Sequence, residues 1–135
     1  MNRADADALY AKDTACKSLG ITIDEVGPGS AVLRMRVTEV MANSHGRAHD
    51  GYLFLLADAA FAYAGNVTSQ ASLAQSAQVT FLNPAVVGDV LLAEAREQDV
   101  TVSRNGAGII AEFHGHGVTV VSPPALTARI PCGMV

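Results

Sequence analysis

The sequence predicts an α+β protein in which an antiparallel sheet packs around one central helix. Two alternating segments precede a long apolar segment, and several strand-like segments follow it. The apolar segment, residues 51–65, is hydrophobic on nearly every side, and such a helix is buried rather than laid on a surface. A sheet curved around this helix would cover most of it, and a second subunit could cover the rest.

The N-terminal part of the chain is expected to contain a helix and a hairpin. Apolar residues recur at helical spacing over residues 4–19, and the helix would end at Gly20. Alternation of apolar and polar residues predicts strands over 21–26 and 31–40, joined by a Gly- and Pro-containing turn. Residues 43–50 are predicted to form the loop that leads into the central helix.

The part of the chain after the central helix is expected to be mostly strand. Strand-like segments are 73–84, 88–106, 107–115 and 116–122. The first stops at Pro84, and the second is one long strand or two, closed by a turn at Asn105-Gly106. The Pro-rich tail, 123–135, is expected to be irregular. The whole chain, residues 1–135, is predicted to be a single domain.

Composition excludes several classes of protein. Half of the residues are apolar and 16% are charged, so disorder is not expected. The net charge of −4 argues against binding to nucleic acid or to an anionic membrane surface. Aromatic residues make up 5% of the chain and Trp is absent, so base-stacking platforms are poorly supported.

Location and redox state can also be predicted from the sequence. The N-terminus carries acidic residues where a signal peptide would have an apolar core. The longest apolar stretch is interrupted by Asp58 and is short for a bilayer span. Cys16 and Cys132 are not in a metal-binding spacing. We therefore expect a reduced, cytoplasmic protein in which the cysteines are structural.

One acidic residue, Asp58, lies in the middle of the apolar helix. A buried carboxylate costs several kcal/mol if it stays charged and unpaired. No Lys or Arg occurs between Arg47 and Arg96, so no cation on the same helix can pair with it. Two interpretations stay open: Asp58 accepts hydrogen bonds at a subunit interface, or it is a catalytic carboxylate tuned by its apolar surroundings.

Helix geometry connects Asp58 with the start of its own helix. Gly51 and Asp58 are seven residues apart, so they lie on nearly the same face, about 10.5 Å apart along the axis. The helix N-terminus offers free N–H groups to an anion. A carbonyl under attack needs oxyanion donors and nucleophile within about 3 Å. Two antiparallel helices can supply both, so such a site requires at least a dimer.

Three segments of the sequence together resemble a known family. They are NSHGRAHDGYLFLLADAAFAYA (43–64), FLNPAVVGD (81–89) and, more weakly, SRNG (103–106). They resemble the signature of hotdog-fold thioesterases of the PaaI type, associated with phenylacetate degradation, and the resemblance covers about residues 19–122. It implies a hotdog fold and a homotetramer built from dimers, with active sites at the dimer interface.

The resemblance also implies an activity. Members hydrolyse acyl-CoA thioesters without a metal or bound cofactor, and the resemblance implies phenylacetyl-CoA or ring-hydroxylated phenylacetyl-CoA as the substrate here. Asp58 matches the family's catalytic carboxylate, which acts as general base or as nucleophile. Asn43 matches a loop residue that helps to place the water or the thioester. His49 matches the loop histidine that shapes the helix start, and Ser76 matches a polar residue near the nucleophilic water.

The expected oxyanion hole contains a departure from the family pattern. The usual His-Gly-Gly is here His49-Asp50-Gly51. The backbone N–H groups of Asp50 and Gly51 could still donate, but positive φ would suit Asp less well than Gly. A carboxylate about 4 Å from the oxyanion would cost about 4 kcal/mol at a dielectric near 20, or roughly three powers of ten in rate. Alternatively, Asp50 is an N-cap. We expect weak or altered activity, or a different substrate.

Other side chains have two interpretations each. His45 and His49 could bind a metal, but Gly46 argues against the helix that would align them, and hydrogen bonding within the loop is the alternative. His114 and His116 are expected on one face of a strand. Three arginines could hold CoA phosphates: Arg34, Arg36 and Arg104. For Arg34 and Arg36 a solvated strand face is the alternative. Four aromatic residues are expected in the core or an acyl pocket: Tyr52, Phe54, Phe61 and Tyr63.

Two other functions stay open. The sequence has no GxSxG, P-loop or GxGxxG motif, which counts against serine hydrolases, nucleotidases and dinucleotide oxidoreductases. A non-catalytic acyl-CoA binding protein could keep the fold while Asp50 disables the oxyanion hole. A hotdog enoyl-CoA hydratase or dehydratase is the other alternative.

Overall fold

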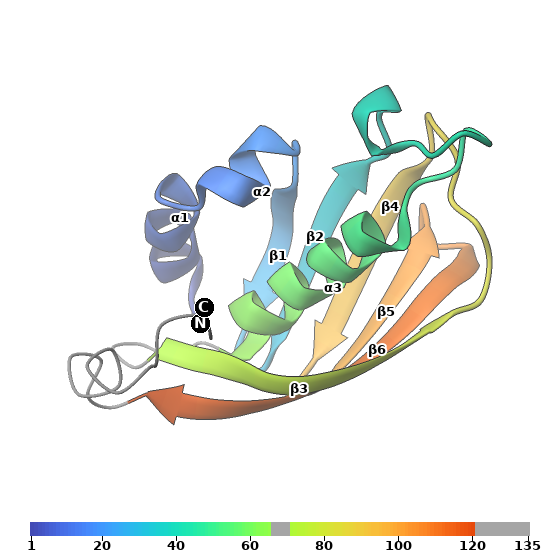
Figure 1. Ribbon diagram of the computed structural model, residues 1–135. Helices are drawn as coiled ribbons and strands as arrows, with labels where there is room; N and C mark the ends of the chain where they lie inside the picture. The colour runs from blue at the N-terminus through green and yellow to red at the C-terminus, as the bar shows by residue number, and fades with distance from the viewer. Residues whose placement is uncertain (66–70, 121–135) are drawn as a thin grey trace, which may run out of the picture.

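The computed structural model of the protein describes residues 1–65 and 71–120 of the chain. One antiparallel sheet has the strand order β1-β2-β4-β5-β6-β3, and α3 lies along its concave side (Figure 1). The helices are α1 (Arg3–Ala11), α2 (Thr14–Ser18), the 3-10 helix η1 (Glu39–Met41) and α3 (Asp50–Gly65). The strands are β1 (Thr22–Gly27), β2 (Ser30–Arg36), β3 (Ala71–Phe81), β4 (Val90–Arg96), β5 (Asp99–Arg104) and β6 (Gly108–Val120).

The core lies between α3 and the inner face of the sheet. Side chains of α3 such as Leu53, Leu56 and Ala60 are buried. They pack in one cluster with inward-facing residues of the central strands: Leu33, Met35, Leu91, Ala93, Val100 and Val102. Each large apolar side chain buried in this way contributes about 1.5–3 kcal/mol. This burial fixes the position of α3 and therefore of the polar residues that it carries.

The central helix agrees with its prediction to within one residue at its start. It covers residues 50–65, against an expected 51–65.

Within residues 1–65 and 71–120, no helix is long and apolar enough to cross a membrane.

The N-terminal segment is two helices, so the prediction of a single helix over 4–19 is wrong. The chain turns at Lys12, and the Asp13 side chain caps α2 by accepting a hydrogen bond from the Cys16 N–H (3.1 Å). The same carboxylate accepts a hydrogen bond from the Tyr63 hydroxyl of α3 (3.0 Å). The cap favours a new helix here because it satisfies a free N–H group in the first turn of α2. The bond from Tyr63 links α2 to the central helix.

Several strand boundaries also differ from the predictions. The expected strand over 31–40 ends at Arg36 and is followed by η1. Residues 88–106 form two strands, which was one of the two alternatives. The segment expected to hold two strands, 107–122, is one strand, β6, over its described part. The predicted irregular tail, 123–135, lies outside the described residues, together with Cys132.

A glycine explains why β6 continues where a break was expected. Gly115 is buried and pairs with Ala77 of β3. A Cβ at this position would lie 2.7 Å from Cε1 of Phe61 and 2.8 Å from Cε1 of Phe113. Gly115 therefore makes room for two core rings instead of ending the strand.

We expect the substitution Gly115→Ala to destabilise the protein by about 1–3 kcal/mol, because the added methyl group overlaps two packed aromatic rings. The measurement is urea denaturation. Gly108→Ala is the matched control, since a Cβ at Gly108 meets no heavy atom within 4 Å. Equal stability of the two variants would contradict the packing role of Gly115.

Candidate active site

Several hydrogen bonds hold the loop before α3, and the Asn43 side chain accepts two of them. Asn43 Oδ1 accepts hydrogen bonds from the N–H groups of His45 (2.9 Å) and Arg47 (3.1 Å). The Asn43 N–H donates to the Arg47 carbonyl (2.7 Å), and the His49 N–H donates to the Met41 carbonyl (2.9 Å). Asn43 therefore shapes the loop that sets the start of α3.

The start of α3 presents free backbone donors. Asp50 is the first helical residue and Gly51 the second, and both are exposed. Neither residue has positive φ, so the backbone does not require glycine at position 50. The first N–H groups of a helix have no partner within it, and no other described residue accepts from these two. The Asp50 carboxylate also has no hydrogen-bond partner among the described residues, so it does not act as an N-cap.

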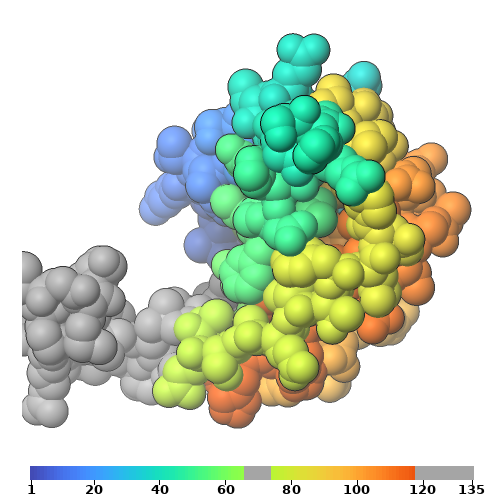
Figure 2. Space-filling model, turned by 45° about the vertical axis from the view of Figure 1, so that its right-hand side comes forward, coloured from blue at the N-terminus to red at the C-terminus, as the bar shows by residue number. Residues whose placement is uncertain are grey.

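A hollow of about 300 Å³ lies beside these donors. Asn43, Arg47 and Asp50 line this hollow together with the segment after β3. Apolar side chains there include Leu53, Phe81 and Leu82. Figure 2 shows this side of the molecule, where α3 (green) reaches the surface between the loop (teal) and β3 with its following segment (yellow-green). The hollow therefore gives a ligand access to the N-terminal end of α3.

Asp58 is half-buried, about two turns along the same face of α3. Burial raises the pKa of its carboxyl group above the usual 3.8. No described residue makes a hydrogen bond or ion pair with this carboxylate. Because the folded-state pKa is the higher one, ionised Asp58 lowers stability above that pKa, and this cost disappears below 3.8. Asp58 is therefore not explained by a contribution to the stability of the chain.

One predicted site residue, Ser76, lies elsewhere. Ser76 pairs with His116, and both are exposed, whereas the adjacent Gly115 and the nearby Phe113 are buried on the inner face. The register therefore puts Ser76 on the outer face of the sheet, away from α3, so within one chain it does not belong to the site. The face of Ser76 follows from its pairing with His116, a contact between distant segments that the sequence alone does not show. His49 is exposed beside Asp50 at the helix start.

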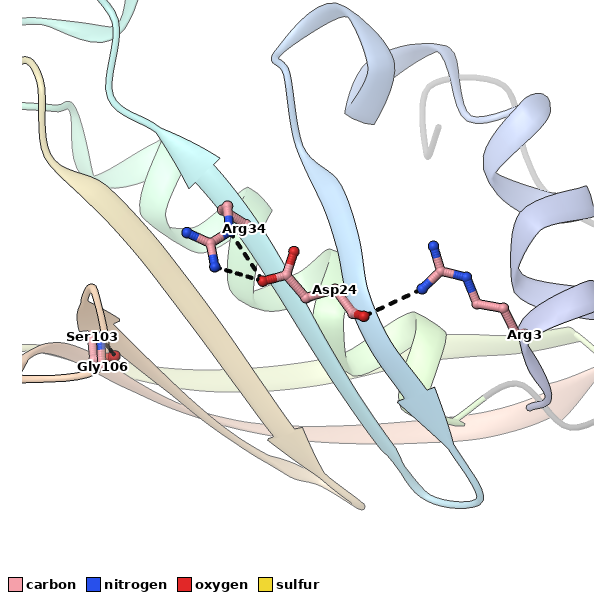
Figure 3. Close-up of polar contacts among 5 residues, drawn as sticks. All are labelled: Arg3, Asp24, Arg34, Ser103 and Gly106. Atoms are coloured by element: carbon pink, nitrogen blue, oxygen red, sulfur yellow. Dashed lines mark hydrogen bonds and ion pairs between the residues drawn. The ribbon is translucent and has the colours of Figure 1, made fainter.

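Two of the three arginines considered as phosphate-binding candidates are paired with acids. Arg34 donates to Asp24 from Nε (3.0 Å) and Nη2 (2.8 Å), as Figure 3 shows. Arg104 donates to Asp89 (3.0 Å) and to the Pro84 carbonyl (2.8 Å). Arg47 lines the hollow but was not among the phosphate-binding candidates predicted from the sequence. Its position three residues before the first residue of α3 could have indicated it.

The aromatic residues and cysteine are placed as follows. Phe113 packs against Phe54 and Phe61, with ring centroids 5.6 Å apart in each pair. Tyr63 is buried, and Phe54 is 38% exposed. Burial, together with Asp13, raises the pKa of Cys16 to about 12, so this thiol is an inert core group.

In residues 1–65 and 71–120, no three His, Cys, Asp or Glu side chains are grouped to hold a metal ion.

The arrangement is that of a hotdog fold: a curved antiparallel sheet packs around one long helix. The face of this helix that the sheet leaves open carries an acidic residue, Asp58. A family model described as the thioesterase superfamily matches residues 45–104. Together with the relatives described next, this shows that the chain belongs to the thioesterase superfamily, and the prediction of fold and family is confirmed.

Two comparisons point to the same relative. The chain is 45% identical over 92 residues to the acyl-coenzyme A thioesterase PaaI of Escherichia coli K12. That match covers 68% of this chain and 66% of the relative, just under two thirds of its length. The structure of the E. coli PaaI protein from the phenylacetic acid degradation operon superposes with a TM-score of 0.82 at 36% identity, covering 87% of this chain and 91% of that one.

A more distant structure shares the fold. The smu.793 protein of Streptococcus mutans UA159, solved with acetyl-CoA bound, is 21% identical and superposes with a TM-score of 0.69. The match covers 74% of this chain and 88% of that one.

We expect Asp58→Asn to be at least as stable as the parent near neutral pH, because the variant removes a charge that burial disfavours. The difference should shrink as the pH falls toward 3.8, where the parent also becomes neutral. Urea denaturation at both pH values measures this, with Glu112→Gln on the exposed outer face as the control. A loss of stability of Asp58→Asn at both pH values would show that Asp58 has a structural role instead.

Proposed function

We propose that this protein hydrolyses acyl-CoA thioesters to a free acid and CoA at a site shared by two copies of the chain. The observation that carries this proposal is that half-buried Asp58 shares a face of α3 with the free N–H groups of Asp50 and Gly51. About 10.5 Å of helix separates them, too far for both to contact one carbonyl carbon. An antiparallel second copy supplies the missing half, so the active form is at least a dimer.

The surface beside the site supports pairing of two chains. β3 is an edge strand, and five consecutive residues of it, 74–78, are exposed. An open edge can pair with a strand of another chain. Large apolar side chains nearby are also exposed: Phe54, Phe81, Leu82, Val86 and Val87. Such a patch is typical of protein interfaces. A tetramer would follow from association of two such dimers, as the family resemblance implies.

The chemistry follows from these positions. The thioester oxygen accepts hydrogen bonds from Asp50 and Gly51 of one copy, which stabilises the charge that develops on it. Asp58 of the other copy either takes a proton from an attacking water or attacks the carbonyl carbon itself, giving an anhydride that water then hydrolyses. The C–S bond breaks and CoA leaves as a thiolate. Asn43 and His49 act by holding the loop and the helix start.

For the acyl group, we propose phenylacetyl or ring-hydroxylated phenylacetyl. The support is the similarity to a protein of the phenylacetic acid degradation operon. Partly exposed Phe54, held edge-on by Phe113, offers an aromatic surface one helical turn from Asp58.

A second candidate function is supported by Asp50. Its exposed carboxylate lines the hollow next to the oxyanion donors, where it repels a developing negative charge. A chain with this defect could bind acyl-CoA without turning it over. Such a binder would be stabilised against heat by acyl-CoA but would release no thiol.

The first test is release of free thiol from phenylacetyl-, hydroxyphenylacetyl-, benzoyl-, acetyl- and long-chain acyl-CoA. We expect release to be highest for the phenylacetyl esters, and Asp58→Asn to lose at least about a thousandfold in kcat/KM. Equal release by parent and variant would remove Asp58 from the mechanism. No release from any ester, with thermal stabilisation by acyl-CoA, would establish the binding protein.

Replacement of Asp50 tests the oxyanion hole. We expect Asp50→Gly to raise kcat by about fivefold to a thousandfold, since repulsion at 4 Å is about 1 kcal/mol in water and about 4 kcal/mol in a partly buried site. Asp50→Asn removes the charge but keeps a side chain of similar size. If the charge lowers the rate, this variant should show most of the increase in kcat expected for Asp50→Gly. Unchanged rates in both variants would show that Asp50 carries no penalty.

A further inference from the structure

The arginines of this protein differ in their freedom to bind an anion. Arg3, Arg34 and Arg104 form ion pairs with acids of the same chain. Arg47 is exposed, and no ion pair joins its side chain to any acid in the described part of the chain, including Asp50 three residues away. Its guanidinium group is therefore available to a ligand.

The position of Arg47 is set by its backbone. Its N–H donates to Asn43 Oδ1 (3.1 Å), its carbonyl accepts from the Asn43 N–H (2.7 Å), and it forms a β-bridge with Val86. These contacts hold Arg47 at the hollow beside the helix N-terminus, and it is the one Lys or Arg among the residues that line this hollow. The same lining includes the apolar side chains of Leu53, Phe81 and Leu82.

We propose that Arg47 binds a phosphate of the CoA moiety and so sets the preference for CoA thioesters over thioesters of shorter thiols. This inference rests on the proposed function, because it needs the thioester carbonyl at the N–H groups of Asp50 and Gly51. From there the pantetheine arm follows the apolar wall of the hollow, and the charged end of CoA reaches its exposed rim. A guanidinium group binds phosphate oxygens with two parallel hydrogen bonds.

Overall charge makes such a local cation important. The chain carries a net charge of −4, so its average field repels a polyanionic substrate. Asp50 adds a further negative charge to the same hollow. An unpaired arginine at the rim offsets both effects where the phosphates arrive. The alternative role for Arg47, neutralising Asp50 during the reaction, would act on every thioester alike, and this difference makes the two roles separable.

The experiment compares one acyl group on two thiols: CoA and N-acetylcysteamine, which lacks the phosphates. We expect Arg47→Gln to raise KM for the CoA ester roughly tenfold with little change in kcat, and to leave kcat/KM for the N-acetylcysteamine ester unchanged. Arg47→Lys should recover part of the loss. Arg96→Gln is the control, because Arg96 is also exposed and without an ion pair among the described residues but lines a different hollow.

A dephospho-CoA ester distinguishes the phosphates. If Arg47→Gln still raises KM for this ester, Arg47 contacts the pyrophosphate, and if it does not, Arg47 contacts the 3′-phosphate. Equal losses for the CoA and N-acetylcysteamine esters would overturn the proposal. If the parent releases no thiol, the proposed hydrolysis fails, and calorimetric binding of CoA then decides on Arg47 separately. Roughly tenfold weaker binding by Arg47→Gln would support its role, and unchanged binding would overturn it.

Discussion

The burial of α3 in the curve of the sheet is the constraint on which the rest of the structure depends. This helix is apolar on nearly all sides, so the free energy is lowest when strands cover it. The inner faces of β2, β4 and β5 cover it with Leu33, Met35 and Leu91 among others. One stripe, with Gly51, Phe54 and Asp58, is left partly open. The uncovered stripe is where the polar chemistry and the proposed second copy meet.

The two acids on α3, Asp50 and Asp58, lie in different surroundings and have different effects on the candidate site. Asp58 is half-buried, and its raised pKa shows that its surroundings favour the neutral form. An unpaired carboxylate in such a place is typical of functional sites. Asp50 is exposed at the helix start, where a negative charge is favourable toward the helix dipole but unfavourable toward an oxyanion. Helix stability and oxyanion binding therefore compete at position 50, while Arg47 supplies positive charge at the same hollow.

The N-terminal helices also depend on α3. Asp13 caps α2 and accepts a hydrogen bond from Tyr63 of α3 (3.0 Å), and Tyr10 donates to the Ile21 carbonyl (2.6 Å). These bonds fix α1 and α2 near β1 and α3, as Figure 1 shows. Cys16 is buried within this contact, which explains its raised pKa.

The sequence by itself determined the fold class, the extent of α3 and the family, because periodicity and the segment around Asn43–Phe61 are local properties of the chain. It also located Asp58 and the loop that precedes α3. Only the tertiary structure decided that β6 continues past Gly115, since the packing of Phe61 and Phe113 is a contact between distant segments. The same is true of Ser76, which its pairing with His116 puts on the outer face. That Arg47 stays without an ion pair at the hollow was likewise decided by folding, because Asp24 and Asp89 pair with Arg34 and Arg104 instead.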